Sequence, residues 1–413
     1  MCEIRLNKKI ATLLIVAAIV VAIVAGVTVT TLFFSNQEET IDNRIQDLME
    51  EGDIPSFAAG IIINDTMVWS KGYGEQSDLD TVYMIGSVTK MFTATVIMQL
   101  YDNDLLDLDA DINDYIPFSV RHPDFPNTPI TIRMLLTHKS GIADSVSNKT
   151  LWDFDAEMLT WANNNLGANI TLWNARPTLG AFLNGSLNPF GPYYSPENWV
   201  SQPGVQREYS GPGFLLLAYI VEQLTNQPFS EYLQKNVYDP LDMTSTGYDY
   251  ADFTGRNAVP YELRDNENFA YPVYNQYDLG GGGLRSTVPD LGNFLIAHMN
   301  QGSYNNAQIL QPQTVDLMQT SQYTMFGHEL GGFTYIGHGL GWPLYKDQTI
   351  GHGGATPGYL AQIAFQTVGN SKYGIVFLLN RGASLVEDDY LVNMFFPTVI
   401  DILFDEAARL ASN

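Results

Sequence analysis

The chain contains little cysteine and little basic charge. Its single cysteine, Cys2, excludes an internal disulfide framework and any zinc site built from several cysteines. The 45 acidic residues outnumber the 20 basic ones, which gives a formal net charge of −25. A surface this acidic repels a phosphate backbone, so we expect no nucleic-acid partner.

Several common catalytic patterns are also missing. No Gly-x-Ser-x-Gly elbow occurs, which argues against an α/β-hydrolase triad. His328 and Glu329 begin like a zinc-protease helix, but position 332 is glycine where the second histidine would stand. No Gly-x-x-x-x-Gly-Lys phosphate loop is found. We therefore expect no metal and no nucleotide or other cofactor.

A long apolar run stands near the N-terminus. Residues 10–34 are apolar apart from threonines and one glycine, and Arg5, Lys8 and Lys9 precede them. At 1.5 Å per residue a helix of this length crosses the hydrocarbon layer of about 30 Å. The run predicts an uncleaved transmembrane helix at 10–34. Residues 1–9 would then lie in the cytoplasm, and the residues after 34 would lie on the outer side of the cell membrane. A cleaved signal peptide is the alternative.

The strongest chemical signal is Ser87-Val88-Thr89-Lys90, at the start of an apolar helical stretch. If Ser87 opens a helix, Lys90 at i+3 lies on the same face and its ammonium reaches the serine hydroxyl. A serine becomes a useful nucleophile when neighbouring groups accept its proton. Ser-x-x-Lys alone is a weak pattern, because such matches arise by chance on helix surfaces.

Two further motifs follow Ser-x-x-Lys along the chain, first Tyr209-Ser210-Gly211 and then His352-Gly353-Gly354. With Ser-x-x-Lys, they resemble the serine β-lactamase-like superfamily, which includes class C β-lactamases, D-amino-acid peptidases and family VIII-type esterases. Three longer segments support the resemblance: TIRMLLTHKSG at 131–141, GGLRSTVPDL at 282–291 and GHGGATPGY at 351–359. The resemblance runs from about residue 40 to the end of the chain.

The resemblance implies roles for the motif residues. Ser87 is the expected nucleophile, and Tyr209 is a better candidate than Lys90 for the base that takes its proton. A neutral Lys90 near pH 7 would need its pKa lowered by about three units, which costs roughly 4 kcal/mol. His352 stands where lactamases present lysine, and Gly353 and Gly354 let substrate lie close to the strand. The backbone N–H groups of Ser87 and Ala355 are the implied oxyanion hole.

One position departs from the family pattern. Gly211 stands where the third residue of Tyr-x-Asn would be asparagine, whose amide steadies substrate in true lactamases. We therefore expect hydrolysis of small esters or peptide-type amides, with these small molecules as the substrates. Two alternatives stay open: a penicillin-binding, D-alanyl carboxypeptidase or β-lactamase role, and a degenerate non-catalytic binding or scaffold protein. The sequence gives no oligomeric state.

The expected fold is α+β, an α/β sandwich in which helices flank an antiparallel sheet and a mostly helical subdomain is inserted. Strands are predicted at 57–63, 67–73, 359–367 and 372–379, and helices from 41 and across 390–410. Strands near both ends predict one sheet from distant segments. We place the hydrolase domain at 35–413, with a sheet part at about 40–75 and 275–413 and a helical part at about 76–274.

Overall fold

The structure, a computed structural model, describes residues 40–76, 78–144, 154–170, 175–330, 333–382 and 390–412. The predicted transmembrane segment at 10–34 lies outside these residues. Within the described part, no helix is long and apolar enough to cross a membrane. Residues 46–413 form one compact unit and residues 1–45 another, and the helix α2 (Ile41–Gly52) begins in the latter.

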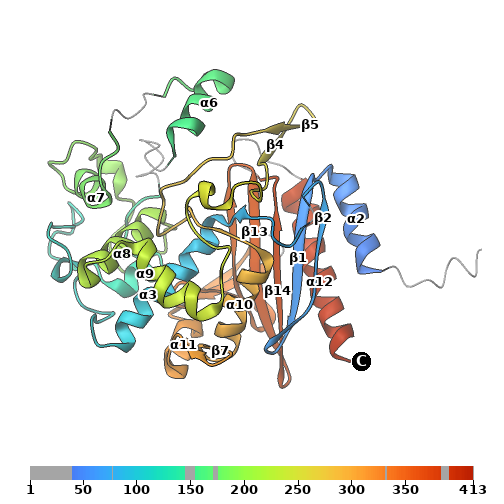
Figure 1. The fold of residues 1–413 in the computed structure, drawn as a ribbon. Coiled ribbons are helices and arrows are strands. Elements are labelled where there is room, and N and C mark those ends of the chain that lie inside the picture. Colours follow the sequence, from blue (N-terminus) through green and yellow to red (C-terminus); the bar gives the residue numbers. More distant parts are fainter. Residues whose placement is uncertain are drawn as a thin grey trace, which may run out of the picture. The chain divides into compact units, whose positions relative to one another are not determined.

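The centre of the larger unit is an antiparallel sheet assembled from both ends of the chain (Figure 1). Among the described residues, its strand order is β2, β1, β14, β13, β12, β11, β10 and β9. The bounds are β1 (Ser56–Ile63), β2 (Thr66–Gly74), β9 (Tyr323–Leu330), β10 (Phe333–His338), β11 (Pro343–Tyr345), β12 (Thr349–Thr356), β13 (Tyr359–Val368) and β14 (Ser371–Leu379). The two predicted hairpins, β1–β2 and β13–β14, are confirmed, and β1 pairs with β14.

Helices cover both faces of this sheet. The helix α10 (Val288–Met299) packs on one face and α12 (Phe396–Ala411) on the other (Figure 1). Residues on the two faces of β14 contact different helices. Gly374 lies against α10, and Phe377 lies against Phe396 of α12. Pro397 stands in the first turn of α12, where proline is favoured because its missing N–H is not needed.

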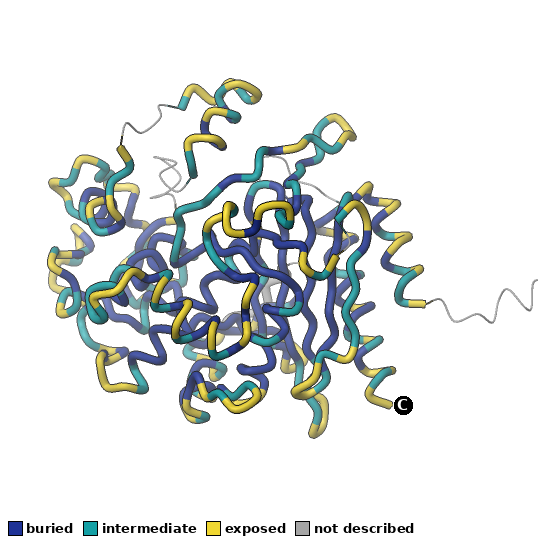
Figure 2. The backbone as a smooth tube through the Cα atoms, in the orientation of Figure 1, coloured by how far each residue is buried: buried dark blue, intermediate teal, exposed yellow. Residues whose placement is uncertain are grey.

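Most of the helices lie, in sequence, between strand β2 and the later strands of the sheet. They comprise α3 (Thr89–Asp102), α4 (Ile132–Leu136), α6 (Ala156–Leu166), α7 (Leu179–Leu187), α8 (Gly211–Thr225) and α9 (Phe229–Leu233), while α11 (Pro312–Gln319) follows α10. Every residue of α3 from Thr89 to Leu100 is buried, including the polar Lys90 and Gln99, so this helix lies inside the domain and not at its surface. The central strands β1, β13 and β14 and the helix α3 are mostly buried, whereas the edge strand β2 is mostly not (Figure 2). The α+β class with an antiparallel sheet is thus as expected.

Candidate active site

Ser87 lies on a single 3-10 turn, Gly86–Val88, between the short strand β3 (Tyr83–Met84) and α3. The prediction that Ser87 opens the α-helix is wrong by two residues, because α3 begins at Thr89. Gly86 has a φ of +50°, and a Cβ there would meet the nitrogen of Ala355 at 2.6 Å. Glycine therefore lets this turn press against strand β12.

Lys90 stands in the first turn of α3 and is 2% exposed. Its Nζ donates to Ser87 Oγ at 3.1 Å and to the carbonyl oxygen of Gly281 at 2.6 Å. The Lys90 ammonium therefore reaches the Ser87 hydroxyl as expected, although the α-helix begins later. The reason is that residues three apart align in a 3-10 turn. The ammonium also lies 4.9 Å from the centre of the Tyr209 ring.

Tyr209 stands two residues before the start of α8 (Gly211–Thr225), and its position is fixed by how that helix begins. Ser210 is the N-cap, and its hydroxyl accepts a hydrogen bond from the Gly213 N–H at 3.1 Å. The Ser210 N–H donates to His138 Nδ1 at 3.2 Å. Held in this way, the Tyr209 hydroxyl lies 2.5 Å from Ser87 Oγ. The structure thus brings Ser87, Lys90 and Tyr209 together from segments 122 residues apart.

Charges around Lys90 favour its ammonium form. Burial lowers the pKa of Lys90, but Tyr209, Asp278 and Asp144 raise it by more, so that the net shift is upward. Lys90 is therefore protonated at neutral pH. If the Ser87 hydroxyl loses its proton, a protonated Lys90 cannot accept it. The nearest group that can is Tyr209.

Two carboxylates lie beside Gly211, where the family pattern has asparagine. The Gly211 N–H donates to Asp144 Oδ1 at 2.7 Å. A Cβ on residue 211 would lie 3.2 Å from that oxygen and 3.8 Å from Asp278 Oδ2. The carboxylates thus border the space that an asparagine side chain would enter. Sequence reasoning missed Asp144 and Asp278, because neither belongs to a motif with recognisable spacing.

Strand β12 carries the other predicted site residues. A Cβ on Gly354 would lie 1.9 Å from the oxygen of Ile85 and 3.0 Å from the nitrogen of Ser87, so the strand passes directly against the turn that carries Ser87. A Cβ on Gly353 would lie 2.9 Å from Oε1 of Gln362. The backbones of Ser87 and Ala355 therefore lie side by side, as an oxyanion hole would require.

His352 is 7% exposed and its Nδ1 lies 2.5 Å from the carbonyl oxygen of Gly353. Burial, together with the charge of Lys90, lowers the pKa of His352 to about 3. The imidazole is therefore neutral near pH 7, and its Nδ1 carries the proton that this carbonyl accepts. A neutral His352 supplies no positive charge for an anionic substrate group.

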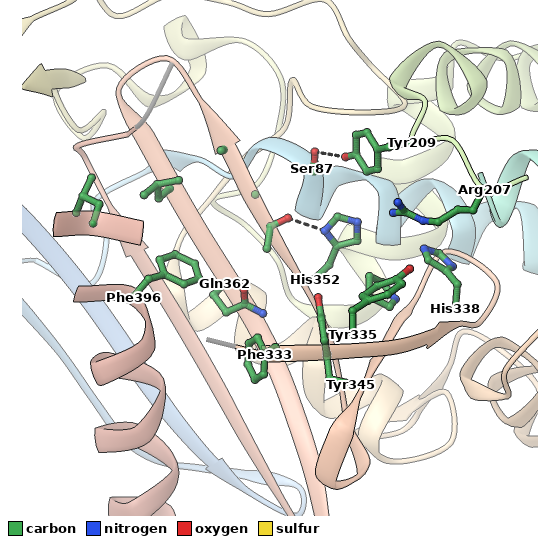
Figure 3. Close-up of a pocket in the computed structure, with 16 residues that line it drawn as sticks. Ser87, Arg207, Tyr209, Phe333, Tyr335, His338, Tyr345, His352, Gln362 and Phe396 are labelled. Carbon is green, nitrogen blue, oxygen red and sulfur yellow. Dashed lines mark hydrogen bonds between the residues drawn. The ribbon is translucent and has the colours of Figure 1, made fainter. Parts of the chain in front are cut away.

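A cavity of about 350 Å³ opens beside Ser87 and Tyr209 (Figure 3). Its wall is mostly aromatic and aliphatic, with a few polar side chains among them. It is lined by Ser87, Arg207, Tyr209, Phe333, Tyr335, His338, Pro343, Tyr345, His352, Gly353, Gly354, Ala355, Leu360, Gln362, Leu391 and Phe396. All seven site residues expected from the sequence except Lys90 line this cavity, and Lys90 is buried behind Ser87.

Beyond the motif residues, no aromatic residue of the cavity wall was assigned to the site from the sequence. Phe333 and Tyr335 belong to β10, Tyr345 to β11 and Phe396 to α12. His338, which belongs to none of the sequence motifs, is buried and lines the cavity. Burial lowers the pKa of His338 to about 4. Among the residues that the structure describes, no three His, Cys, Asp or Glu side chains gather as a metal site would require.

These lowered histidine pKa values predict how activity depends on pH. His352 and His338 take up protons only as the pH falls toward 3 and 4, so neither changes charge between about pH 5 and pH 8. In kcat/KM profiles for an ester, His352→Gln is expected to keep the wild-type shape over that range, whatever its effect on the absolute rate. A wild-type limb near pH 6.5 that disappears in His352→Gln would contradict this.

The beta-lactamase family model matches residues 41–392, which is most of the chain. The chain therefore belongs to the beta-lactamase family. Among curated proteins it is similar to Protein flp of Staphylococcus aureus (strain N315), with 25% identity over 367 residues. That alignment covers 86% of this chain and 66% of Protein flp, so the chain spans just under two thirds of that relative's length.

Solved structures share the fold. The octameric penicillin-binding protein homologue from Pyrococcus abyssi aligns with a TM-score of 0.69 and 23% identity, covering 90% of this chain and 77% of the other. The D-amino acid amidase from Ochrobactrum anthropi SV3, in complex with L-phenylalanine, aligns with a TM-score of 0.66 and 20% identity. This alignment covers 90% of this chain and 99% of the amidase chain. At these identities the likeness concerns the β-lactamase and penicillin-binding protein fold.

Proposed function

We propose that this protein is a serine hydrolase that cleaves small esters or peptide-type amides through an acyl-enzyme on Ser87. The observation that carries the proposal is the position of Ser87 Oγ, within hydrogen-bond distance of both Lys90 Nζ and the Tyr209 hydroxyl. A hydroxyl placed between a cation and a proton acceptor, and facing a cavity, is arranged for nucleophilic attack.

In the proposed acylation each of these groups has a defined role. Tyr209, acting as its phenolate, accepts the proton of Ser87 while the serine oxygen attacks the carbonyl carbon of the substrate. The negative charge that develops on the carbonyl oxygen meets the backbone N–H groups of Ser87 and Ala355. Lys90 stays protonated and stabilises the negative charge on the serine and tyrosine oxygens. Tyr209 then protonates the leaving alcohol or amine as the carbonyl–heteroatom bond breaks.

Deacylation repeats these steps with water as the nucleophile. Tyr209, again as the phenolate, takes a proton from the water that attacks the acyl carbon, and returns a proton to Ser87 Oγ as the ester bond breaks. His352 remains neutral throughout, so its part is hydrogen bonding and shape. The free acid leaves and the enzyme returns to its starting state.

The shape of the cavity supports an apolar acyl group as the preferred one. Phe333, Tyr335, Tyr345 and Phe396 present rings to the space beside Ser87. Gly211 supplies no side-chain amide for the amide of a β-lactam, and neutral His352 supplies no cation for its carboxylate. Both features lower our expectation of β-lactam turnover. A penicillin-binding or D-amino-acid amidase activity remains the second candidate, favoured by the structural likeness to such an amidase.

Turnover of three chromogenic substrates tests this ranking. We expect 4-nitrophenyl butyrate to be hydrolysed faster than D-alanine 4-nitroanilide, and a chromogenic cephalosporin to be hydrolysed slowest. Cephalosporin hydrolysis faster than ester hydrolysis would reverse the ranking. A folded protein that turns over none of the three, and is not acylated at Ser87, would support a non-catalytic role.

We also propose that the chain is held in a cell membrane by residues 10–34, with the hydrolase part facing outward. The support is the length of that apolar run and the basic residues Arg5, Lys8 and Lys9 on its N-terminal side. Extraction with alkaline carbonate tests it. The full chain is expected to stay with the membrane pellet, and release into the supernatant would contradict the anchor.

A further inference from the structure

Arg207 is a cavity residue that the motifs do not include. It stands two residues before Tyr209, and its side chain lines the same cavity as Ser87. Its guanidinium carbon lies 5.8 Å from the centre of the Tyr209 ring and 5.3 Å from that of Tyr335. Figure 3 shows the side chain extending toward Tyr209 and His352. One tyrosine ring therefore separates this cation from the candidate nucleophile.

Within the described residues, Arg207 contacts the rings of Tyr209 and Tyr335 and hydrogen-bonds to Tyr323, and none of these groups is a carboxylate. Among the side chains that the structure describes, ion pairs join four other arginines to carboxylates, but none includes Arg207. Its Nε is buried without a hydrogen-bond partner in the described part of the chain. Aromatic rings attract a guanidinium without using its N–H donors, so the hydrogen bond to Tyr323 leaves other donors of Arg207 available for a planar anion.

The other basic groups near the cavity do not compete for an anion. His352 and His338 are neutral near pH 7, because burial lowers their pKa values to about 3 and about 4. Lys90 is buried behind Ser87 and already donates to Gly281 and Ser87. At long range the net charge of −25 repels anions. Any preference for an anionic substrate must therefore arise locally, at Arg207.

We propose that Arg207 is a specificity residue that binds a carboxylate on the acyl part of the substrate. The preferred acyl donor then has an apolar chain, which lies against the aromatic wall, and an acidic group at its far end. This inference rests on the proposed acyl-serine hydrolysis, and it names the substrate class of that same site. A guanidinium matches a carboxylate through two parallel N–H to oxygen hydrogen bonds.

A matched pair of esters tests the inference: mono-4-nitrophenyl adipate, which carries a free carboxylate, and its methyl ester, which is neutral. Both release the same leaving group, so the kcat/KM ratio isolates recognition of the carboxylate. We expect the wild-type ratio to favour the acid by about 10- to 100-fold. Arg207→Gln should bring the ratio close to one, and Arg207→Lys should keep part of the preference because it retains the charge.

Arg256→Gln is the matched control. Arg256 also contacts a ring, that of Phe253 at 5.6 Å, and lies outside the cavity lining. Its substitution removes the same charge from the molecule and should leave the ratio as in the wild type. A wild-type ratio near one, or a ratio that Arg207→Gln does not change, overturns the inference while leaving ester hydrolysis intact.

Calorimetric binding of adipate and of its neutral diamide separates this inference from the proposed function. If neither ester is hydrolysed and Ser87 is not acylated, the proposed hydrolase function fails, but binding is still measurable. Adipate that binds more tightly than the diamide to the wild type, and loses that advantage in Arg207→Gln, supports the anion site. Equal binding of the two compounds overturns it.

Discussion

Ser87→Ala is expected to lower kcat/KM for 4-nitrophenyl butyrate by about 10⁴-fold or more, close to the rate without enzyme. Removal of a serine nucleophile eliminates the covalent route, and what remains comes from substrate binding and the oxyanion donors. The loss of one oxygen from a turn should not unfold the protein, because the neighbouring backbone contacts remain. Initial rates at low substrate concentration measure the effect, and thermal unfolding checks that the variant is folded.

Ser303→Ala is the control for this substitution. Ser303 lies in the short strand β7 (Ser303–Tyr304) and does not line the cavity. Its replacement should leave kcat/KM within about twofold of the wild type, since surface substitutions away from a site have small effects. If Ser87→Ala retained more than a tenth of the wild-type rate, Ser87 would not be the nucleophile.

Lys90→Met is expected to lower kcat/KM by about 10³-fold, within the range that proton-transfer catalysis and its supporting charges contribute. Methionine approximates the length of the lysine stem but provides no cation. The hydrogen bond from Nζ to Ser87 Oγ disappears, and so does the charge that stabilises negative oxygens on Ser87 and Tyr209. The effect should fall on kcat more than on KM, because the charge acts on the developing transition state.

Lys90→Arg should not rescue this loss. The guanidinium is larger and planar, and Lys90 is enclosed between Ser87, the Tyr209 ring and the carbonyl of Gly281. Lys346→Met, at an exposed position of the chain, removes a cation elsewhere and should be nearly neutral. An active Lys90→Met enzyme, within tenfold of the wild type, would mean that Ser87 is activated by Tyr209 without help from the ammonium.

The elements that the sequence predicted well are those with a strong local signal. The strands at β1, β2, β13 and β14 combine apolar runs with clear turn residues, and the bounds of all four were predicted to within one residue. The start of α3 was misplaced because Gly86 and Ser87 adopt a 3-10 turn, a choice made by the contact with β12. Tertiary contacts of this kind leave no periodic pattern in the sequence.

The candidate site also contains residues that the sequence could predict and residues that it could not. Ser87, Lys90, Tyr209 and the residues of β12 stand in short motifs, and their approach in space followed from the family resemblance. Asp144 and Asp278 lack such a marker, because they reach the site through the packing of separate segments, and Arg207 stands beside Tyr209 but belongs to no motif. The aromatic wall was equally hidden, since its rings come from β10, β11 and α12, which are short or distant from the motifs.

Mass spectrometry of the protein after brief exposure to a fluorophosphonate and, separately, to a slow ester substrate tests the central claim most directly. Ser87 is predicted to carry the adduct in both cases, and Ser87→Ala is predicted to carry none, because the hydroxyl activated by Lys90 and Tyr209 is the group that attacks. An adduct that maps to another residue, or a folded wild-type protein that forms no adduct with either reagent, would contradict the account.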